Sequence, residues 1–259
     1  MAKGKERLDV LLVERGLAET RARARAYIMA GEVSVNGERV DKAGTEVPRD
    51  ATIDLATPMP YVSRGGYKLA GALEKFGIPV EGRVAADVGA CTGGFTDVLL
   101  QHGALRVFAI DVGQGQLVWK LRQDERVVVL ERTNARYLES LAEPIDLVVI
   151  DVSFISLKLI LPAVKKWLAG DADVVALIKP QFEAGPEFVG KGGIVRDSAV
   201  HRAVLRDVLQ WAANHEWGVM NLMQSTIHGT DGNIEYLVHL RVDGQVSSDI
   251  DMLIEDVMK

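Results

Sequence analysis

The sequence predicts an α/β protein whose larger domain is built on a doubly wound, mostly parallel sheet. From about Val84 onward, apolar runs rich in β-branched residues alternate with longer helical segments. Five runs have the length of buried strands, namely VAADVG, LRVFAIDVG, RVVVLE, IDLVVIDVS and ADVVALIK. Because such alternation produces parallel strands with crossover helices, we expect helices on both faces of the sheet.

Further elements complete this domain toward the C-terminus. GVMNLMQSTI and NIEYLVHLRV predict two more strands that are close enough to pair as a hairpin. A helix is expected near residues 198–213, and apolar residues at helical spacing predict another over 249–259. We therefore place the large domain at residues 64–245 and an acidic C-terminal helix or tail at 246–259.

Residues 6–30 predict two short helices. The first has an apolar stripe and ends at Gly16, whereas Thr20 is a suitable N-cap for the second, which stops at Gly31. Residues 32–35 then alternate as a short strand.

The next segment predicts further short strands. Asn36 and Gly37 form a strong hairpin signal, and strands and turns are expected to follow as far as Leu55. Pro58 and Pro60 resist regular structure. These features predict a small α+β domain over 1–56 and a linker over 57–63.

Composition limits the classes of protein to consider. The chain has 259 residues, of which 48% are apolar and 25% charged, as in soluble globular proteins. Its apolar runs are too short to span a membrane, and charges interrupt the apolar stretch at the N-terminus, so we expect neither a membrane helix nor a secretory signal. A single cysteine excludes an internal disulfide, and the five histidines lack ligand spacing, so no metal site is expected. A cytoplasmic location follows as the simplest expectation.

Charge is distributed unevenly along the chain. The net charge of −6 argues mildly against a nucleic-acid partner. Residues 1–31, however, carry seven basic and four acidic side chains, which leaves a local charge of +3. Because the local footprint matters more than the overall charge, this segment is a candidate nucleic-acid surface. The alternative is an ordinary solvated helix face.

The segment DVGACTGGFT, residues 87–96, ends the first strand of the large domain. In open α/β sheets, ligands bind beyond the carboxyl ends of strands, where glycines let the backbone approach them closely. The G-x-x-x-G-G spacing differs from dinucleotide and P-loop motifs, so a small cofactor without a pyrophosphate fits better. Asp111 ends the next strand, where its carboxylate can accept hydrogen bonds from both hydroxyls of an adenosine ribose. A tight turn with a surface aspartate is the alternative.

Four charged residues form a second candidate set. Asp151 and Lys179 each stand at the carboxyl end of an apolar strand. Since burial of an unpaired lysine is costly, we expect Asp151 and Glu235 to provide compensating carboxylates, with Lys68 close by. A structural ion pair at the sheet edge is the alternative.

Several collinear motifs resemble one family over residues 6–240. SRGGYKLAGAL, DVGACTGGFTDVLLQ, IDVGQGQL, ERTNARYL, DVSFISL, KPQFEAG, KGGIVRD and GNIEYL are similar to the TlyA (hemolysin A) family of ribosomal RNA 2′-O-methyltransferases. The catalytic domain of that family resembles the FtsJ/RrmJ ribose methyltransferases. TRARARAYIMAGEVSVNGERV resembles the S4 RNA-binding domain.

The resemblance implies a Rossmann-like class I methyltransferase with a seven-stranded sheet and S-adenosylmethionine as its cofactor. It implies a catalytic tetrad of Lys68, Asp151, Lys179 and Glu235, in which Lys179 assists deprotonation of the 2′-hydroxyl. The cofactor-binding residues would be Asp87, Gly89, Cys91, Thr92, Gly93, Gly94, Phe95, Asp111 and Asn134. The RNA-binding residues would be Arg7, Arg21, Arg23, Arg25, Asn36 and Arg64.

The sequence departs from the family pattern at two places. Cys91 stands where serine is expected in the glycine loop, a small-for-small change that should preserve cofactor binding. The linker, TPMPYV, lacks the Arg-x-Trp-Val sequence of some members, so an interdomain signalling role is not expected from it.

The predicted substrate is a cytidine or other nucleotide in structured 16S or 23S ribosomal RNA, and the predicted partner is ribosomal RNA or a ribosomal subunit. A base N-methyltransferase would carry an Asn/Asp-Pro-Pro-Tyr type of motif after the fourth strand, where this chain has Asp151-Val-Ser-Phe. A haemolysin would need a membrane-active segment. The remaining alternative is a non-catalytic ribosome assembly factor. The sequence leaves the oligomeric state open.

Overall fold

A computed structural model describes residues 4–29, 31–55, 59–229, 232–242 and 249–259. The chain divides into two compact units, Met1–Pro60 and Tyr61–Lys259. Residues 56–58, which span the expected boundary between the small domain and the linker, lie outside the described residues, as do residues 243–248 around the expected boundary of the C-terminal tail.

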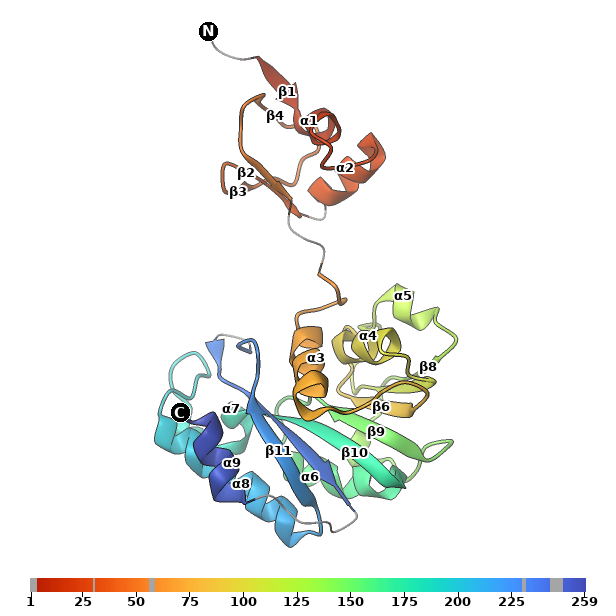
Figure 1. Ribbon diagram of the computed structural model, residues 1–259, viewed down its shortest axis with the longest axis vertical. Helices are drawn as coiled ribbons and strands as arrows, with labels where there is room; N and C mark the ends of the chain where they lie inside the picture. Colours follow the sequence, from red (N-terminus) through yellow and green to blue (C-terminus); the bar gives the residue numbers. More distant parts are fainter. Residues whose placement is uncertain (1–3, 30, 56–58, 230–231, 243–248) are drawn as a thin grey trace. The chain divides into compact units, whose positions relative to one another are not determined.

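The described residues of the small unit form two short helices and five short strands, and Figure 1 shows the helices beside the strands. Its elements are β1 Lys5–Arg7, α1 Leu8–Glu14, α2 Arg21–Met29, β2 Val33–Val35, β3 Glu38–Arg39, β4 Glu46–Pro48 and β5 Ile53–Leu55. Strands β1 and β4 form one antiparallel pair, and β3-β2-β5 form a three-stranded antiparallel sheet. Both helices bury apolar side chains against these strands, with Leu8, Leu12 and Ile28 completely buried.

The local signals predicted for this unit are confirmed. Thr20 Oγ1 accepts a hydrogen bond from the Arg23 amide at 3.2 Å and so caps α2. Asn36 and Gly37 have φ angles of 52° and 84°, the left-handed conformation that a tight β2–β3 hairpin requires.

The large unit is built on a seven-stranded sheet with the order β11-β12-β10-β9-β6-β7-β8. The last five strands in this order, β10, β9, β6, β7 and β8, are mutually parallel, and β12 is antiparallel to both β10 and β11. The bounds are β6 Val84–Val88, β7 Arg106–Ile110, β8 Val127–Leu130, β9 Ile145–Ile150, β10 Leu168–Ile178, β11 Gly218–Gln224 and β12 Tyr236–Arg241. The mostly parallel α/β fold predicted from the sequence is therefore confirmed.

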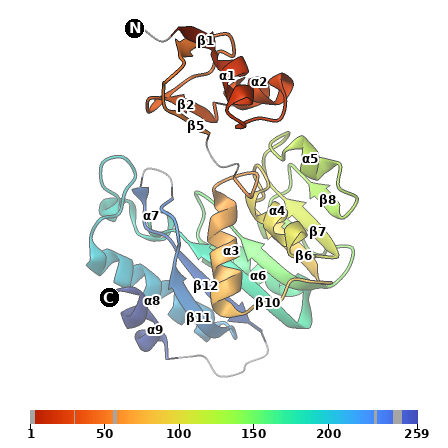
Figure 2. The ribbon, with the colours of Figure 1, turned by 45° about the horizontal axis from the view of Figure 1, so that its top comes forward.

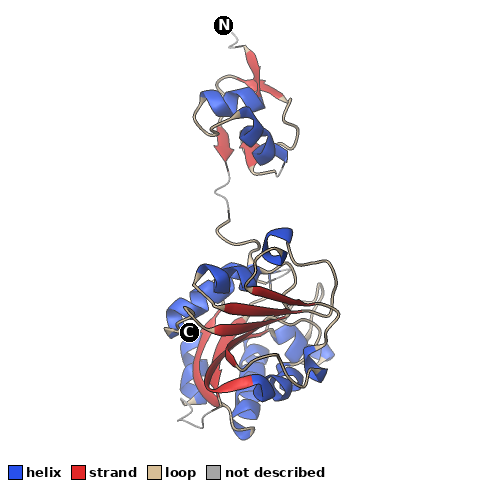
Figure 3. Cartoon of the chain, turned by 90° about the vertical axis from the view of Figure 1, so that its right-hand side faces the viewer, coloured by secondary structure: helices blue, strands red, loops and turns tan. Residues whose placement is uncertain are grey.

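Helices cover both faces of this sheet (Figure 3). One face packs against α3 Gly65–Phe76, α4 Gly94–Gln101 and α5 Trp119–Arg122, with α3 crossing in front of the sheet in Figure 2. The other face packs against α6 Leu157–Val164, α8 Ser198–Asn214 and α9 Ile250–Val257. The remaining helices are α7 Pro180–Glu183 and the 3₁₀ turns η1 Ala135–Tyr137, η2 Lys165–Trp167 and η3 Pro186–Phe188. Alternate residues of each central strand point to opposite faces, so the apolar runs supply two cores.

The strand order brings distant residues to one edge of the sheet. Val88 is paired with Ile150, so Gly89 and Asp151 leave the sheet side by side. Because β12 is antiparallel to β10, its first residue, Tyr236, is paired with Ile178, and Glu235 therefore lies next to Lys179. Within the described residues, the helices are too short or too polar to cross a membrane.

Candidate active site

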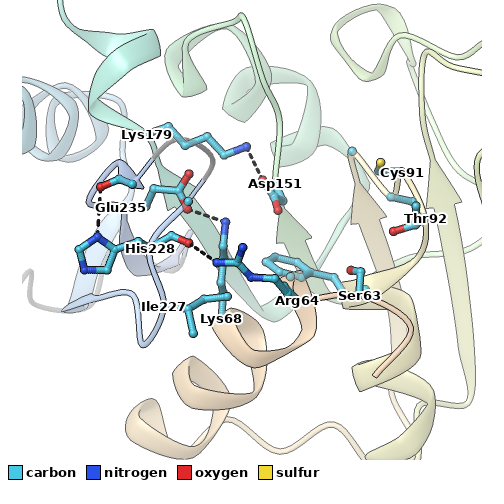
Figure 4. A pocket seen from close by; sticks show the side chains of 17 residues that line it. Ser63, Arg64, Lys68, Cys91, Thr92, Asp151, Lys179, Ile227, His228 and Glu235 are labelled. Atoms are coloured by element: carbon cyan, nitrogen blue, oxygen red, sulfur yellow. Dashed lines mark hydrogen bonds and ion pairs between the residues drawn. The ribbon is translucent and has the colours of Figure 1, made fainter. Parts of the chain in front are cut away.

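Lys68, Asp151, Lys179 and Glu235 converge on one cavity of about 570 Å³ (Figure 4). They come from four separate elements: Lys68 from α3, Asp151 from the end of β9, Lys179 from the end of β10, and Glu235 from the residue before β12. This is the spatial convergence that the sequence interpretation requires.

The four side chains form two ion pairs. Lys68 Nζ donates to Glu235 Oε2 at 2.5 Å, and Lys179 Nζ lies 2.6 Å from Asp151 Oδ1. Lys179 Nζ also donates to Ser153 Oγ at 3.0 Å. Both lysines are only 8% exposed, a burial that a lysine tolerates when a carboxylate compensates its charge. The site therefore presents two fixed lysine–carboxylate pairs to one cavity.

A second cavity, of about 470 Å³, lies along the neighbouring strand ends. Asp111 and Asn134 line it together with apolar side chains such as Ile110, Val112 and Ile155. Gly89, Cys91 and Asp151 line both cavities, so the two are adjacent. An elongated ligand with one apolar end fits this arrangement.

Asp111 is held in place by the backbone. Its Oδ2 accepts from the Cys91 amide at 2.8 Å and its Oδ1 from the Gly113 amide at 2.7 Å. Asn134 Oδ1 accepts from the Arg136 amide at 3.0 Å and caps η1. These bonds fix both polar side chains at the rim of the second cavity.

The glycines between residues 89 and 94 permit close approach of the backbone. A Cβ at Gly89 would lie 2.3 Å from the Asp151 carbonyl oxygen, and one at Gly93 would lie 2.2 Å from Leu121 Cδ1. Both residues have left-handed φ angles, 88° and 98°. Cys91 shares this conformation, with φ 49°. Gly94 begins α4, and a Cβ there would meet Ser63 Oγ at 2.2 Å.

Two predicted cofactor residues are set back from the surfaces of the cavities. Among the described residues, the lining of the two cavities does not include Asp87 or Gly93. Asp87 is completely buried, and its Oδ2 accepts bonds from the Thr96 amide and hydroxyl at 2.8 and 2.7 Å. Burial raises the pKa of Asp87 to about 7, the Thr96 hydrogen bonds oppose this rise, and the charge of Asp151 adds to it.

Sequence reasoning missed several residues of the first cavity, among them Ser63, His228 and Gly229. Arg64, expected to bind RNA, also lines this cavity and donates to the His228 carbonyl oxygen at 3.1 Å. A Cβ at Gly229 would lie 2.2 Å from Glu235 Oε1. Gly229, three residues before the start of GNIEYL, was the available signal for this close approach.

The small unit gathers three of the predicted RNA-binding arginines around one carboxylate. Arg7, Arg21 and Arg25 each lie 3.0 Å from Asp9, which is completely buried and which sequence reasoning missed. The hydrogen bond from Arg7, followed by those from Arg25 and Arg21, holds the pKa of Asp9 well below its usual range, against the effect of burial. The arginine side chains stay 42–53% exposed, so this cluster presents a net positive surface.

The other two candidates of this unit have local partners. Arg23 donates to the Tyr27 hydroxyl at 3.1 Å and lies over its ring. Asn36 Oδ1 accepts from the Thr52 amide at 2.9 Å, which gives this side chain a role in the hairpin.

A doubly wound sheet of this order, with ligand cavities at the carboxyl edge where the strand order reverses, defines a Rossmann-like methyltransferase fold. Residues 61–242 match the FtsJ-like methyltransferase family, and residues 6–53 match the S4 domain. The chain therefore belongs to the FtsJ-like methyltransferase family and carries an N-terminal S4 domain.

Similar proteins span nearly the whole chain. A putative rRNA methyltransferase, YqxC, of Bacillus subtilis is 50% identical over 100% of this chain and 94% of its own length. The 16S/23S rRNA (cytidine-2′-O)-methyltransferase TlyA of Mycobacterium tuberculosis is 47% identical over 91% of this chain and 89% of its own length. A solved structure described as a putative hemolysin from Streptococcus thermophilus is 47% identical, with a TM-score of 0.74 over 99% of this chain and 96% of that one. These findings confirm the predicted TlyA resemblance.

Residues with metal-ligating side chains do not cluster in the described parts of the chain: no group of three or more His, Cys, Asp or Glu there could hold an ion.

Proposed function

We propose that this protein transfers a methyl group from S-adenosylmethionine to the 2′-hydroxyl of a nucleotide in ribosomal RNA. The observation that carries the proposal is the Lys179–Asp151 ion pair, at 2.6 Å, in which Asp151 lines both cavities and Lys179 lines the first. Lys179 would then face a second substrate in the first cavity, next to a cavity suited to a nucleoside. The TlyA relative, named for cytidine 2′-O-methylation of 16S and 23S rRNA, supports the same acceptor.

The second cavity fits the adenosine half of the cofactor. Asp111 offers a carboxylate to ribose hydroxyls, and the apolar side chains beside Asn134 offer a surface for an adenine ring. The glycine loop would hold the methionine half, because its backbone approaches Asp151 without an intervening Cβ. When bound, S-adenosylmethionine supplies an electrophilic methyl group on a sulfonium.

The first cavity would hold the acceptor ribose. A 2′-hydroxyl is a poor nucleophile until its proton is withdrawn, and Lys179 Nζ, as a neutral amine, would accept that proton while the hydroxyl oxygen bonds to the methyl carbon and the carbon–sulfur bond breaks. Asp151 and Ser153 fix Lys179 Nζ from two directions, and the Lys68–Glu235 pair lines the same cavity. Much of the acceleration would come from holding the hydroxyl oxygen in line with the methyl carbon.

The small unit would provide RNA affinity. Guanidinium groups gathered on Asp9 suit phosphate oxygens, whose contacts fix the register of an RNA without reading its sequence. The residue assignments and the domain limits given above, 1–56 for RNA binding and 64–245 for methyl transfer, are part of this proposal.

The decisive experiment incubates the purified chain with ribosomal subunits and methyl-labelled cofactor, digests the RNA, and locates the label by mass spectrometry. We expect the label on a ribose. Label on a base would contradict the proposal, and binding without any transfer would indicate an assembly factor instead.

A lysine variant tests the assigned chemistry. Lys179→Met is expected to lower kcat by about 100-fold or more, the usual scale of acid–base assistance, while the cofactor Kd stays within about threefold. Lys165→Met is the matched control, because Lys165 pairs with exposed Glu216 on the surface. Loss of cofactor binding in Lys179→Met would show that Lys179 is structural.

A further inference from the structure

Two loops carry the Lys179–Asp151 pair, and a series of contacts joins them. The first, the 151–156 loop, follows β9; the second, the 179–183 loop, follows β10 and comprises Lys179 and the short helix α7, Pro180–Glu183. At one end the loops meet through Lys179, Asp151 and Ser153. In the middle, the rings of Phe154 and Phe182 lie 4.8 Å apart between centroids.

Glu183 joins the far ends of the same loops. Its Oε2 accepts from the Ser156 hydroxyl at 2.6 Å, and its Oε1 accepts from the Leu157 amide at 2.8 Å. Ser156 is itself the N-cap of α6, since its Oγ accepts from the Lys158 amide at 3.2 Å. One carboxylate of the second loop therefore fixes the point where the first loop enters a helix.

The 151–156 loop contains a residue with a strained backbone conformation. Phe154, between Ser153 and Ser156, has a φ of 62°, a left-handed conformation that a side chain as large as phenylalanine rarely adopts. Its side chain is 90% exposed, so the Phe154 ring gains little from burial to offset that conformation. Strained backbone of this kind persists only where surrounding contacts hold it. The Glu183 bonds hold one end of the loop, and the Lys179 contacts hold the other.

We propose that Glu183 is a positioning residue for methyl transfer, which keeps Asp151 and Ser153 in register with Lys179 by fixing the 151–156 loop to the 179–183 loop. This inference rests on the proposed function. The carboxyl group faces away from the reaction: among the described residues, the lining of the two site cavities does not include Glu183. The carboxyl group of Glu183 is partly buried beside a separate hollow along α8, and this burial raises its pKa. The hydrogen bonds from Ser156 and Leu157 oppose that rise, because they favour the charged carboxylate.

The test compares three substitutions in the full chain. Glu183→Ala removes both bonds and is expected to lower kcat by about tenfold or more, with the RNA KM and the cofactor Kd within about threefold. Glu183→Gln should retain kcat within about threefold, because its amide oxygen can accept from Leu157 and its NH₂ group can donate to Ser156 Oγ. Asp249→Ala is the matched control: it removes the N-cap of α9, where Asp249 accepts from Met252 at 3.1 Å, and should leave kcat unchanged.

Hydrogen exchange on the same proteins makes the two proposals separable. In Glu183→Ala, amides of residues 151–157 should exchange faster than in wild type, whereas Asp249→Ala should leave them unchanged. If wild type transfers no methyl group, the proposed function fails, and exchange at 151–157 still decides whether Glu183 holds the loop. Should Glu183→Ala not fold, Ser156→Ala, which keeps the Leu157 bond, is expected to reduce kcat with the same KM. Wild-type kcat and wild-type exchange in Glu183→Ala, or in Ser156→Ala where that variant replaces it, would overturn the inference.

Discussion

Replacing Asp87 with asparagine is expected to change how the stability of the large unit depends on pH. Burial raises the pKa of this carboxyl from 3.8 to about 7, against the hydrogen bonds from Thr96. The folded chain therefore binds the proton more tightly than the unfolded chain does. The stabilising contribution of Asp87 is fully present below pH 3.8 and is lost as the pH rises through 7.

The size of this effect follows from the two pKa values. Each pH unit between them lowers the free energy of unfolding by ~1.4 kcal/mol, and integration from pH 5 to pH 8 gives a loss of about 2–3 kcal/mol from this one group. Asparagine has no proton to lose over this range, and its amide oxygen can accept both Thr96 bonds. The stability of wild type minus that of Asp87→Asn should therefore fall by about 2–3 kcal/mol over the same interval.

Urea unfolding followed by tryptophan fluorescence measures this difference. The four tryptophans, Trp119, Trp167, Trp211 and Trp217, all lie in the large unit, so the small unit does not contribute to the signal. Titrations of groups that do not interact with Asp87 are common to both proteins and cancel in the subtraction. A difference that stays constant from pH 5 to pH 8 would refute the argument, because it would mean that Asp87 ionises alike in the folded and unfolded chains.

Two further substitutions test the second cavity and the first half of strand β10. Asp111→Ala removes the charged acceptor at the proposed ribose site, so it should raise the Kd for S-adenosylmethionine by about tenfold or more, which corresponds to ~1.4 kcal/mol. Calorimetry measures this Kd, and an unchanged value would place the nucleoside elsewhere. Asp173→Asn should lower the free energy of unfolding by ~3 kcal/mol, because completely buried Asp173 accepts bonds at 2.6–2.7 Å from Arg83, Arg241 and His239. A loss below ~1 kcal/mol in urea titrations would show that the two partly exposed arginines are adequately solvated without it.

The sequence predicted the fold well where a single stretch contains its own signal. Buried parallel strands appear as continuous apolar runs, and a charged residue that ends such a run, such as Asp151 or Lys179, must lie at the carboxyl edge of the sheet. The hairpin of β11 and β12 was predicted as well. That β12 rather than β11 pairs with β10 depends on packing between elements, and this pairing is what brings Glu235 to the site.

Residues that act through distant partners were harder to predict. Asp9 occupies a polar position on a short helix, and only the packing of α1 against α2 brings Arg21 and Arg25, 12 and 16 residues away, onto its carboxylate. Glu183 belongs to a recognised motif, KPQFEAG, yet its partners lie 26 and 27 residues earlier in the chain. Asp87 was assigned to cofactor contact because it begins the glycine motif, whereas the alternation of β6 buries it behind the loop.

The insertion of β12 between β10 and β11 has a consequence for synthesis of the chain. The lining of the Asp111 cavity is encoded entirely before residue 161, but the tetrad lacks its last member until Glu235 is made. At ~5–20 residues per second, the ribosome completes the residues of the second cavity, which contains Asp111, several seconds before it completes those of the first. During that interval β11 has been made without its partner strand and β10 has an open edge. A nascent chain thus passes through a stage in which it has the residues of the proposed cofactor cavity but lacks the residue that completes the acceptor site.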